Sequence, residues 1–406
     1  MRKVKPDSLL PVEEARARIL GGVLPLARER VSVGEALGRT LAADLEAKRD
    51  QPPSAVSAMD GYAVRAADVE RLPATLTLVG AASAGHASPH RVGPGEAIRI
   101  FTGATVPDGA DAVVIQENAT ETDRQVTVTE PAEPGRFIRT QGLDFRRGET
   151  LIEAPRRLGP RELALAASMG HGAIAVRRRP IVAILATGSE LVPPGTAPRP
   201  GQIVSSNSIA LAGLVELWGG VARDLGIARD DLKATRRALT RAEGADVLVT
   251  TGGASVGEHD LVRQALVAEG YRLGFWRIAM RPGKPLMFAT RGRRRALGLP
   301  GNPVSAIVCA QVFLKPLIAA LLGLGAPDSG VKARLAEALP ANDRRQDYLR
   351  AKLDRAPDGT LTATAFPVQD SSMQRTLALA DCLIVRPPFD EPQGPGAMVT
   401  VLPLDF

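Results

Sequence analysis

The stretch "ADVLVTTGGASVGEHDLVRQALVAEG", residues Ala245 to Gly270, contains the pattern that decides the fold. The run "ADVLV" is apolar and has the length of one buried strand, and "EHDLVRQALVAEG" has the apolar spacing of a helix. Two adjacent glycines, Gly252 and Gly253, lie between them. A strand, a tight glycine loop and a helix in succession are the repeating unit of a parallel sheet.

The same alternation extends from about Pro180 to Gly325. Strand-length runs occur in "PIVAILATG", "VARDLGI" and "ALGLPG", and helical patterns follow them in "SSNSIALAGLVELWGG", "RDDLKATRRALTRAEG" and "NPVSAIVCAQVFLKPLIAALLG". This alternation predicts a doubly wound, mostly parallel α/β domain. The apolar run from Ala306 to Ala326 contains Gln311, Lys315 and Pro316, so we expect a buried helix and no membrane span.

The flanking regions have a different pattern. Between about residues 70 and 140, short alternating runs such as "ATLTLVG" and "RQVTVTE" predict a β-rich insert. Before it, "PVEEARARIL" and "VSVGEALGRTLAADL" are expected to be helical, and after it "GPRELALAASMG" predicts a helix with Pro160 near its start. We therefore expect a helical module split around the insert. The last 80 or so residues predict a C-terminal β domain, with two runs joined at Pro357-Asp358-Gly359.

Composition narrows the class of protein. Of the 406 residues, 45% are hydrophobic and 23% charged, which excludes wholesale disorder. Only Cys309 and Cys382 are present, both in apolar runs, so we expect buried thiols, no disulfide framework and a cytoplasmic location. The N-terminus does not have the pattern of a signal peptide.

The chain is basic, with a net charge of +7 and a pI of about 9.8. This charge is compatible with nucleic acid, with an anionic substrate or with an arginine-rich proteome. The basic clusters Arg177 to Arg179 and Arg291 to Arg295 lie between apolar runs, so solvated turns are the expected structure. Aromatic residues make up only 3%, which argues against a platform for stacked bases. We expect small-molecule substrates and no nucleic acid.

Acidic side chains follow three of the predicted strands. Glu190, Asp230 and Asp260 each come soon after a strand, at the edge where open α/β sheets bind ligands. Carboxylate oxygens suit Mg²⁺, which one or two carboxylates hold together with substrate phosphates. The alternative is that Asp230 and Asp231 cap the helix that follows them and that Asp260 caps its own.

Three loops have the composition of anion sites. Gly252 and Gly253 permit close backbone approach, so successive N–H groups and the Ser255 hydroxyl can converge on a phosphate. "RPGKP", Arg281 to Pro285, and "LPGNPVS", which ends at Ser305, can each hold an oxyanion, although both can also be ordinary turns. The glycine loop matches neither a Walker loop nor a dinucleotide fingerprint. No zinc site and no nucleophile elbow are visible in the sequence.

Six motifs in a fixed order support a more specific expectation. They are "SAMDGYAV" (Ser57 to Val64), "RIFTGATVPDGADAVVIQE" (Arg99 to Glu117), "TGSEL" (Thr187 to Leu191), "TTGGASVGEHD" (Thr250 to Asp260), "RPGKP" and "LPGNPVSA". Together they resemble the molybdopterin molybdenumtransferase family, the MoeA-like proteins related to the E domain of gephyrin. The resemblance spans essentially the whole chain.

The resemblance implies four modules and a homodimer. The expected modules are a split elongated helical module (1–50 and 146–178), a β-rich insert (51–145), a doubly wound domain that binds the pterin nucleotide (179–327) and a C-terminal β barrel (328–406). The active site is expected between the nucleotide domain of one subunit and the N-terminal region of its partner. Molybdopterin adenylyltransferase and molybdoenzyme chaperones are expected as transfer partners.

The implied reaction inserts molybdate into adenylated molybdopterin, cleaves its phosphoanhydride with Mg²⁺ and releases AMP. By this resemblance, the catalytic residues are Asp60, Thr102, Glu190, Asp230 and Asp260, and the metal ligands are Glu190, Asp230 and Asp260. The implied molybdate pocket contains Arg281, Lys284, Ser305, Arg350 and Ser371. The implied pterin-nucleotide and phosphate contacts are Gly252, Gly253, Ser255, Gly257, Pro300 and Pro303.

The sequence departs from the family pattern at four positions. Arg281 stands where relatives usually have Lys, which replaces a point charge by a planar fork. Ser189 replaces a common Asp, and Asp370 and Ser372 stand where relatives often have Gly. Two alternatives to the insertase are an adenylyltransferase-type enzyme of the same fold and a non-catalytic dimeric scaffold. Adenylyltransferases have one domain, and the retained acidic residues argue against a pure scaffold.

Overall fold

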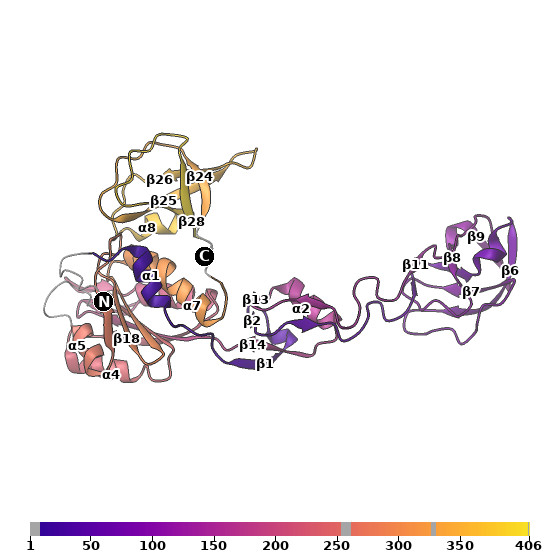
Figure 1. The fold of residues 1–406 in the computed structure, drawn as a ribbon, viewed down its shortest axis with the longest axis horizontal. Helices are drawn as coiled ribbons and strands as arrows, with labels where there is room; N and C mark the ends of the chain where they lie inside the picture. The colour runs from indigo at the N-terminus through magenta and orange to yellow at the C-terminus, as the bar shows by residue number, and fades with distance from the viewer. Residues whose placement is uncertain (1–8, 253–260, 326–329, 405) are drawn as a thin grey trace. The chain divides into compact units, whose positions relative to one another are not determined.

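The computed structural model describes residues 9–252, 261–325, 330–404 and 406. The chain forms two compact units, which we describe separately (Figure 1). The first unit contains residues 1–29 and 177–406, and the second contains residues 30–176. The second unit is therefore an insertion in the chain of the first.

A six-stranded sheet forms the centre of the first unit. In spatial order its strands are β18 (Val221–Ala228), β15 (Ile181–Thr187), β19 (Val247–Thr251), β23 (Arg294–Leu299), β22 (Met287–Arg291) and β20 (Arg272–Phe275). The first four strands are parallel to their neighbours, and β22 and β20 continue the sheet in antiparallel pairing. The predicted doubly wound, mostly parallel sheet is confirmed.

Both faces of this sheet are covered by helices. Residues of α1 (Val12–Leu20) and α3 (Asn207–Leu217) share one hydrophobic cluster with Val182 and Ile184 of β15. Residues of α4 (Leu232–Thr240) and α5 (Leu261–Ala268) share a second cluster with the alternate positions of β15, Ala183 and Leu185. Because successive strand side chains point to opposite faces, one apolar run supplies two cores.

The long apolar helix also belongs to the first cluster. It consists of α6 (Pro303–Cys309), a π-helical segment (Ala310–Leu314) and α7 (Lys315–Leu321). Its length and composition would permit a membrane span, but 83% of its apolar window is buried inside the unit. The predicted buried helix is confirmed. The π segment ends two residues before Pro316, whose missing N–H interrupts regular helical bonding.

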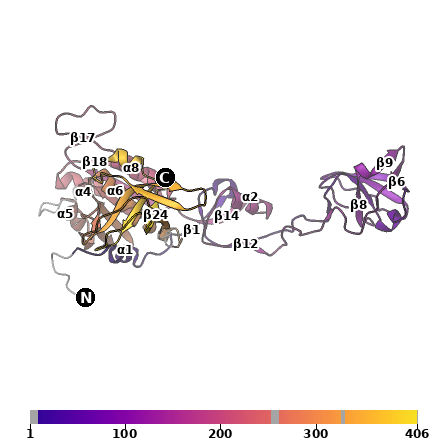
Figure 2. The ribbon, with the colours of Figure 1, turned by 90° about the horizontal axis from the view of Figure 1, so that it is seen from above.

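A five-stranded barrel completes the first unit. Its strands are β25 (Gln346–Arg355), β26 (Leu361–Ala365), β24 (Val331–Leu335), β28 (Met398–Pro403) and β27 (Cys382–Arg386), and pairing of β27 with β25 closes it. The short helix α8 (Gln374–Ala378) precedes β27, and β21 (Met280–Arg281) pairs with β25 from the outside. The predicted C-terminal barrel is confirmed. A small parallel pair, β16 (Leu191–Val192) and β17 (Ile203–Val204), lies by a loop that projects from the unit (Figure 2).

The second unit contains the β-rich insert. Its six-stranded sheet has the order β8 (Ala112–Ile115), β5 (Gly61–Val64), β7 (Glu96–Ile100), β6 (Ala74–Ala82), β10 (Gln125–Val128) and β9 (Ala119–Thr122). A smaller sheet contains β1 (Arg28–Ser32), β14 (Ala173–Arg177), β2 (Thr40–Leu41) and β13 (Arg156–Arg157). Two-stranded pairs join β3 (Leu45–Glu46) to β12 (Thr150–Ile152) and β4 (Val56–Ser57) to β11 (Ile138–Arg139).

One predicted helix of the second unit is present and another is not. The helix α2 (Pro160–Ser168) begins at Pro160 as expected. The expected helix over "VSVGEALGRTLAADL" is wrong, because this segment forms a single 3₁₀ turn (Val33–Glu35) followed by β2. Gly34 and Gly38 lower its helix propensity, and Gly38 has a φ of +71°. The apolar positions of the segment instead join a sheet core.

The cysteines are buried as predicted, but one arginine does not lie where expected. Cys309 and Cys382 are buried free thiols, and burial raises the pKa of Cys382 to about 12. Within the basic cluster 291–295, Gly292 and Arg293 form an exposed turn between β22 and β23. Arg295, however, is only 7% exposed. The prediction of a solvated turn is wrong for Arg295, because this residue lies inside β23 rather than in the turn. It is also wrong for Arg177, which is half-buried at the end of β14.

Candidate active site

The carboxyl edge of the parallel sheet carries a polar cavity of about 410 Å³. Thr187 and Thr251 end β15 and β19 there, and Gly301 follows β23. Of the site residues predicted from the sequence, Glu190, Gly252 and Pro303 line this cavity. Ser206, Asn207, Asn302, Ser372 and Gln374 are among its other lining residues. The volume is within the range of small-molecule sites.

Gly252 is the residue that lets the loop pass close to the neighbouring strand. Its φ is +83°, and a Cβ at this position would lie 2.2 Å from the carbonyl oxygen of Thr187. No other residue type fits without moving one of the two strands. The rest of the predicted cradle, Gly253, Ser255 and Gly257, and the predicted metal ligand Asp260 lie outside the described residues.

The two described acidic residues at this edge have different surroundings. Glu190 lines the cavity and is exposed. Asp230 accepts a hydrogen bond at Oδ2 from the Ser189 N–H (2.9 Å), and its own N–H donates to Ser189 Oγ (3.0 Å). This reciprocal pair joins the chain after β15 to the chain after β18. The helix cap is Asp231, whose carboxylate accepts from the N–H of Ala234, so Asp230 is not the capping residue of α4.

The described residues at this edge supply two carboxylates for Mg²⁺ and not a complete set of protein ligands. Among the described residues there is no group of three or more His, Cys, Asp or Glu side chains that would hold a metal ion. Glu190 and Asp230 are exposed carboxylates at the ends of adjacent strands. Mg²⁺ normally keeps several waters and binds one or two carboxylates together with substrate phosphates. The donor set therefore fits a magnesium ion that arrives with a phosphate substrate.

The start of α6 connects the cavity to the barrel. Asn302 is the N-cap residue, and its side chain donates to Ser371 Oγ (2.8 Å) instead of capping the helix. The N–H of Val304 donates to the carbonyl oxygen of Ser371 (3.2 Å). Ser305 lies in the first turn of the same helix and is 4% exposed. Two predicted molybdate residues, Ser305 and Ser371, are thus brought to one helix end. Pro300 precedes this turn and does not line the cavity.

Asn207 is a cavity residue that the sequence analysis missed. Its Nδ2 donates to the carbonyl oxygen of Gly301 (2.8 Å), whereas its Oδ1 is buried and has no hydrogen-bond partner. A buried amide oxygen without a donor is costly, and a ligand hydroxyl or N–H would satisfy it. The signal available in the sequence was the "SSN" that opens the predicted helix after the first strand.

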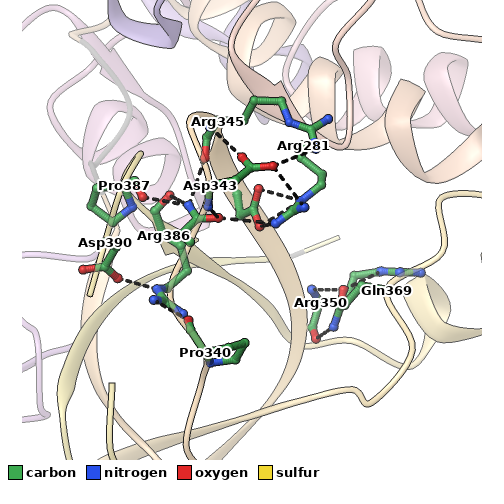
Figure 3. A network of polar contacts seen from close by, with 11 residues as sticks. Arg281, Pro340, Asp343, Arg345, Arg350, Gln369, Arg386, Pro387 and Asp390 are labelled. Carbon is green, nitrogen blue, oxygen red and sulfur yellow. Dashed lines mark hydrogen bonds and ion pairs between the residues drawn. The ribbon is translucent and has the colours of Figure 1, made fainter. Parts of the chain in front are cut away.

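Arg350 is a buried cation without a carboxylate partner among the described residues. It is 1% exposed, and its guanidinium donates to Gln369 Oε1 (3.2 Å) (Figure 3). It also donates to the carbonyl oxygens of Met373 (3.2 Å) and Val368 (3.5 Å). Burial lowers its pKa, and the charge of Asp370 opposes that shift. Three of its five N–H donors have these partners, which leaves donor capacity for an anion.

The carboxylate of Asp370 accepts hydrogen bonds within its own turn. Oδ1 accepts from the N–H (2.8 Å) and the hydroxyl (2.6 Å) of Ser372. These two hydrogen bonds lower the pKa of Asp370. The acid and the Ser372 hydroxyl therefore act as a unit that closes the turn before α8.

Arg281 and Lys284 differ in the hydrogen bonds and ion pairs that their side chains make with described residues. The guanidinium of Arg281 contacts Asp347 through two nitrogens and also reaches Asn342 Oδ1 (3.3 Å) and Asp343 Oδ2 (3.5 Å) (Figure 3). Lys284 is exposed, and its ammonium has no hydrogen bond or ion pair to any described residue. Of the two predicted molybdate cations in "RPGKP", Lys284 is the one whose side chain has no polar partner in the described part of the chain. Neither residue lines the cavity.

Asp60 and Thr102 belong to the second unit and bind each other. Asp60 Oδ1 accepts from both the N–H and the hydroxyl of Thr102, at 2.7 Å each. The N–H donor, followed by the hydroxyl, lowers the pKa of Asp60, and the Arg99 charge acts in the same direction. Arg99 itself stacks between the rings of Tyr62 (4.8 Å) and Phe101 (5.2 Å). Arg99 begins the second quoted motif but was not among the predicted site residues.

Comparison with known proteins agrees with this arrangement. Residues 10–170 match the MoeA N-terminal region (domain I and II), residues 183–320 a probable molybdopterin binding domain, and residues 332–404 the MoeA C-terminal region (domain IV). A molybdopterin molybdenumtransferase of Nostoc sp. is 36% identical over 367 residues, covering 87% of this chain and 84% of the relative. One of Haemophilus influenzae is 36% identical over 318 residues, covering 78% of each.

A solved structure shows the same fold along the chain. The molybdopterin biosynthesis MoeA protein from Pyrococcus horikoshii matches with a TM-score of 0.85 at 30% identity, covering 98% of this chain and 100% of the other. The fold and site therefore define a multidomain α/β enzyme with a polar site at the carboxyl edge of its sheet. The chain belongs to the molybdopterin molybdenumtransferase (MoeA) family.

Proposed function

We propose that this protein inserts molybdate into adenylated molybdopterin, cleaving the phosphoanhydride and releasing AMP. The observation that carries the proposal is the cavity at the carboxyl edge, where Glu190 and the Gly252 backbone lie beside the α6 start that carries Ser305. An acidic residue, a glycine turn and a helix N-terminus are the groups that a magnesium-bound phosphate needs. Family membership supports the choice of pterin and molybdate as substrates.

In this proposal the pterin nucleotide occupies the cavity. The Gly252 turn holds a phosphate by its backbone, and the open Oδ1 of Asn207 accepts a hydrogen bond from the ligand. Mg²⁺, when bound, would neutralise phosphate charge and act as a Lewis acid. Glu190 and Asp230 would hold it, and Ser189 keeps the Asp230 carboxylate oriented. Asp260 is proposed as a third ligand on the family resemblance alone.

Molybdate is a tetrahedral dianion and needs cations and hydroxyls. We place it near Lys284 and Arg350, the two cations of the proposed pocket that lack a carboxylate contact among the described residues, with Ser305 and Ser371 as hydroxyl donors. Arg281 is held by Asp347, so its proposed role is to fix the edge of the pocket. No side chain acts as a covalent nucleophile in this scheme.

The proposal also includes a homodimer in the cytoplasm. Asp60 and Thr102 would reach the nucleotide site of a second subunit. The proposed function of the polar loop before β5 is to contribute to that site. Molybdopterin adenylyltransferase and molybdoenzyme chaperones are the proposed delivery and acceptor partners. In the described part of the chain, only the buried helix Pro303–Leu321 passes the length and composition test for a membrane span.

The test is to form active cofactor from purified components. The protein is incubated with adenylated molybdopterin, molybdate and Mg²⁺, and the product is read out by activation of an apo-molybdoenzyme. We expect activation that needs both molybdate and Mg²⁺ and that Glu190→Gln and Lys284→Gln reduce. Substrate binding without activation would favour the scaffold. Consumption of ATP and molybdopterin to form the adenylated pterin would favour the adenylyltransferase-type enzyme.

A further inference from the structure

A second cluster of cations lies at the opposite edge of the same sheet. Four arginines and one aspartate are among the residues that line a cavity of about 410 Å³ there: Arg178, Arg293, Arg294, Arg295 and Asp246. Arg178 precedes β15, Asp246 directly precedes β19, and Arg294 begins β23. In parallel strands these positions form the amino edge. The formal charges of the five side chains sum to 4 − 1 = +3.

Arg295 is the buried member of this cluster. It is 7% exposed, and its guanidinium donates to the carbonyl oxygens of Ile19 (3.2 Å), Arg293 (2.7 Å) and Gly21 (2.9 Å). These bonds fix the plane of the guanidinium and use three of its five N–H donors. Its side chain contacts no carboxylate among the described residues. Burial lowers its pKa.

Two other buried arginines can be compared with Arg295 by the groups that hold their guanidinium. Arg386 is 2% exposed and is neutralised by Asp390. Arg350, like Arg295, is held by carbonyl and amide oxygens without a carboxylate, and it belongs to the proposed molybdate pocket. Buried charges in proteins are usually paired. Arg295 therefore resembles Arg350, a proposed anion-binding residue, because neither is paired with a carboxylate among the described residues. It differs from Arg386, which is paired with Asp390.

The other arginines of the cavity differ in their availability. Arg178 is held by two hydrogen bonds to Asp246 (2.8 and 3.0 Å), and Arg294 is held by Glu243. Arg293 is exposed, and its side chain has no hydrogen bond or ion pair to any described residue. The cavity is thus lined by the fixed, buried guanidinium of Arg295 and by the exposed guanidinium of Arg293. The guanidinium of Arg293 is not held by a hydrogen bond or ion pair to any described residue, so it can bind a ligand.

This cavity is distinct from the candidate active site. Strand β15 has seven residues, which corresponds to roughly 20 Å of extended chain. Arg178 lies three residues before its first residue, and Thr187 is its last. An anion at the amino edge therefore cannot also touch the carboxyl-edge residues.

We propose that the amino-edge cavity binds a phosphate group, as inorganic phosphate or as a phosphate ester, between Arg293 and Arg295. The planar fork of arginine matches the paired oxygens of phosphate, and a dianion would reduce the +3 charge of the lining. The cavity is large enough for a group attached to that phosphate. The ligand thus belongs to the same chemical class as the phosphates of the proposed reaction, but it binds at a separate place.

The test is isothermal titration of the full-length protein with inorganic phosphate, and separately with AMP, at low ionic strength. Arg293→Gln removes the free guanidinium without disturbing the core, and Arg295→Lys keeps the buried charge but removes the fork. Arg161→Gln, at an exposed position of α2, makes the same change of net charge elsewhere. Lys284→Gln removes a cation of the proposed active site, so binding there is separated from binding at the amino edge.

We expect Arg293→Gln to weaken binding of phosphate by about tenfold or more, because it removes a charge-assisted hydrogen bond. Binding should persist in Arg161→Gln and in Lys284→Gln. Tighter binding of AMP than of phosphate, with both weakened by Arg293→Gln, would identify a phosphate ester as the ligand. Equal binding by Arg293→Gln and Arg161→Gln, or absence of millimolar binding of either ligand in the parent protein, would overturn the proposal.

Discussion

The guanidinium of Arg281 lies against the buried carboxylate of Asp347, with Nε 2.8 Å from Oδ1 and 2.9 Å from Oδ2. Asp347 is 3% exposed and lies in β25 of the barrel, whereas Arg281 lies in β21, the short strand that pairs with β25. The pair therefore joins the α/β part of the first unit to its barrel. The planar fork of arginine donates to the carboxylate from two nitrogens, whereas a lysine has only one.

Loss of this pair should destabilise the protein in a pH-dependent way. Arg281→Met leaves the Asp347 carboxylate buried without its cation, and we expect a loss of about 1–3 kcal/mol in the free energy of unfolding at pH 7. The value is below that of a fully buried pair because the Arg281 side chain is 47% exposed. Urea unfolding measures it.

The sign of the pH dependence follows from the carboxylate. Burial already raises the pKa of Asp347, and Arg281 opposes this shift, so the variant raises the pKa further. An acid whose pKa is raised by folding destabilises the folded state as pH rises through that pKa. The variant should therefore recover stability, relative to the parent, between pH 7 and pH 4. In the control Arg345→Met, an exposed pair with Asp343 is lost, which should cost less than about 1 kcal/mol. Equal losses in both variants would contradict the assignment.

Gly252→Ala should disturb the candidate site more than a second glycine substitution. Both Gly252 and Gly195 have positive φ, +83° and +82°, but a Cβ on Gly195 would meet nothing within 4 Å, whereas a Cβ on Gly252 would meet Thr187 at 2.2 Å. We expect Gly195→Ala to lose about 1 kcal/mol of stability and Gly252→Ala clearly more. Thermal unfolding and nucleotide binding measure the two effects. Identical behaviour of the two variants would show that the loop after β19 can move freely.

Thr102→Val should raise the pKa of Asp60 toward its ordinary value. The hydroxyl donor is lost but the N–H donor of residue 102 remains, so the return should be partial. In the parent, the lowered pKa contributes stability above the ordinary value of 3.8, and this stability is lost as pH falls through the folded-state pKa. Carboxyl-carbon NMR titration measures the shift, with Thr105→Val as the control. An unchanged Asp60 pKa in Thr102→Val would refute the role of the hydroxyl.

Mixing two inactive variants should restore activity if the site is shared between subunits. Asp60→Ala changes the second unit and Asp230→Ala changes the first. A heterodimer of the two variants would have one site with both residues intact, so random exchange should give about a quarter of the parent rate. The measurement is turnover after co-refolding or co-expression. Activity that stays at the level of the separate variants would place both residues in the same subunit's site or exclude the dimer.

The sequence predicted the parts of the fold that local patterns determine. The alternation around Val247–Thr251 and the glycine after it identified the parallel sheet, and the Pro-Asp-Gly turn identified the β25–β26 hairpin. The segment Val31–Leu45 was misassigned because its apolar spacing suits either a helix or short strands. Only pairing with β13 and β14, more than a hundred residues later, decides the outcome.

The site was predicted less completely for a related reason. Glycines and acidic residues at strand ends mark an edge of the sheet, so Glu190 and Gly252 were found. The open Oδ1 of Asn207, the contact of Asn302 with Ser371 and the engagement of Arg281 by Asp347 all join residues that are distant in the chain. A sequence gives residue types, but it does not show which cation already has a partner.

The most direct test of the proposed function is a measurement of AMP release from adenylated molybdopterin by the purified protein with Mg²⁺, with and without molybdate. Asp230→Asn serves as the comparison, because it keeps the shape of the side chain and removes its charge. The account predicts release that molybdate stimulates and that Asp230→Asn largely loses. Release that is independent of molybdate, or bound substrate from which no AMP is released at any molybdate concentration, would contradict it.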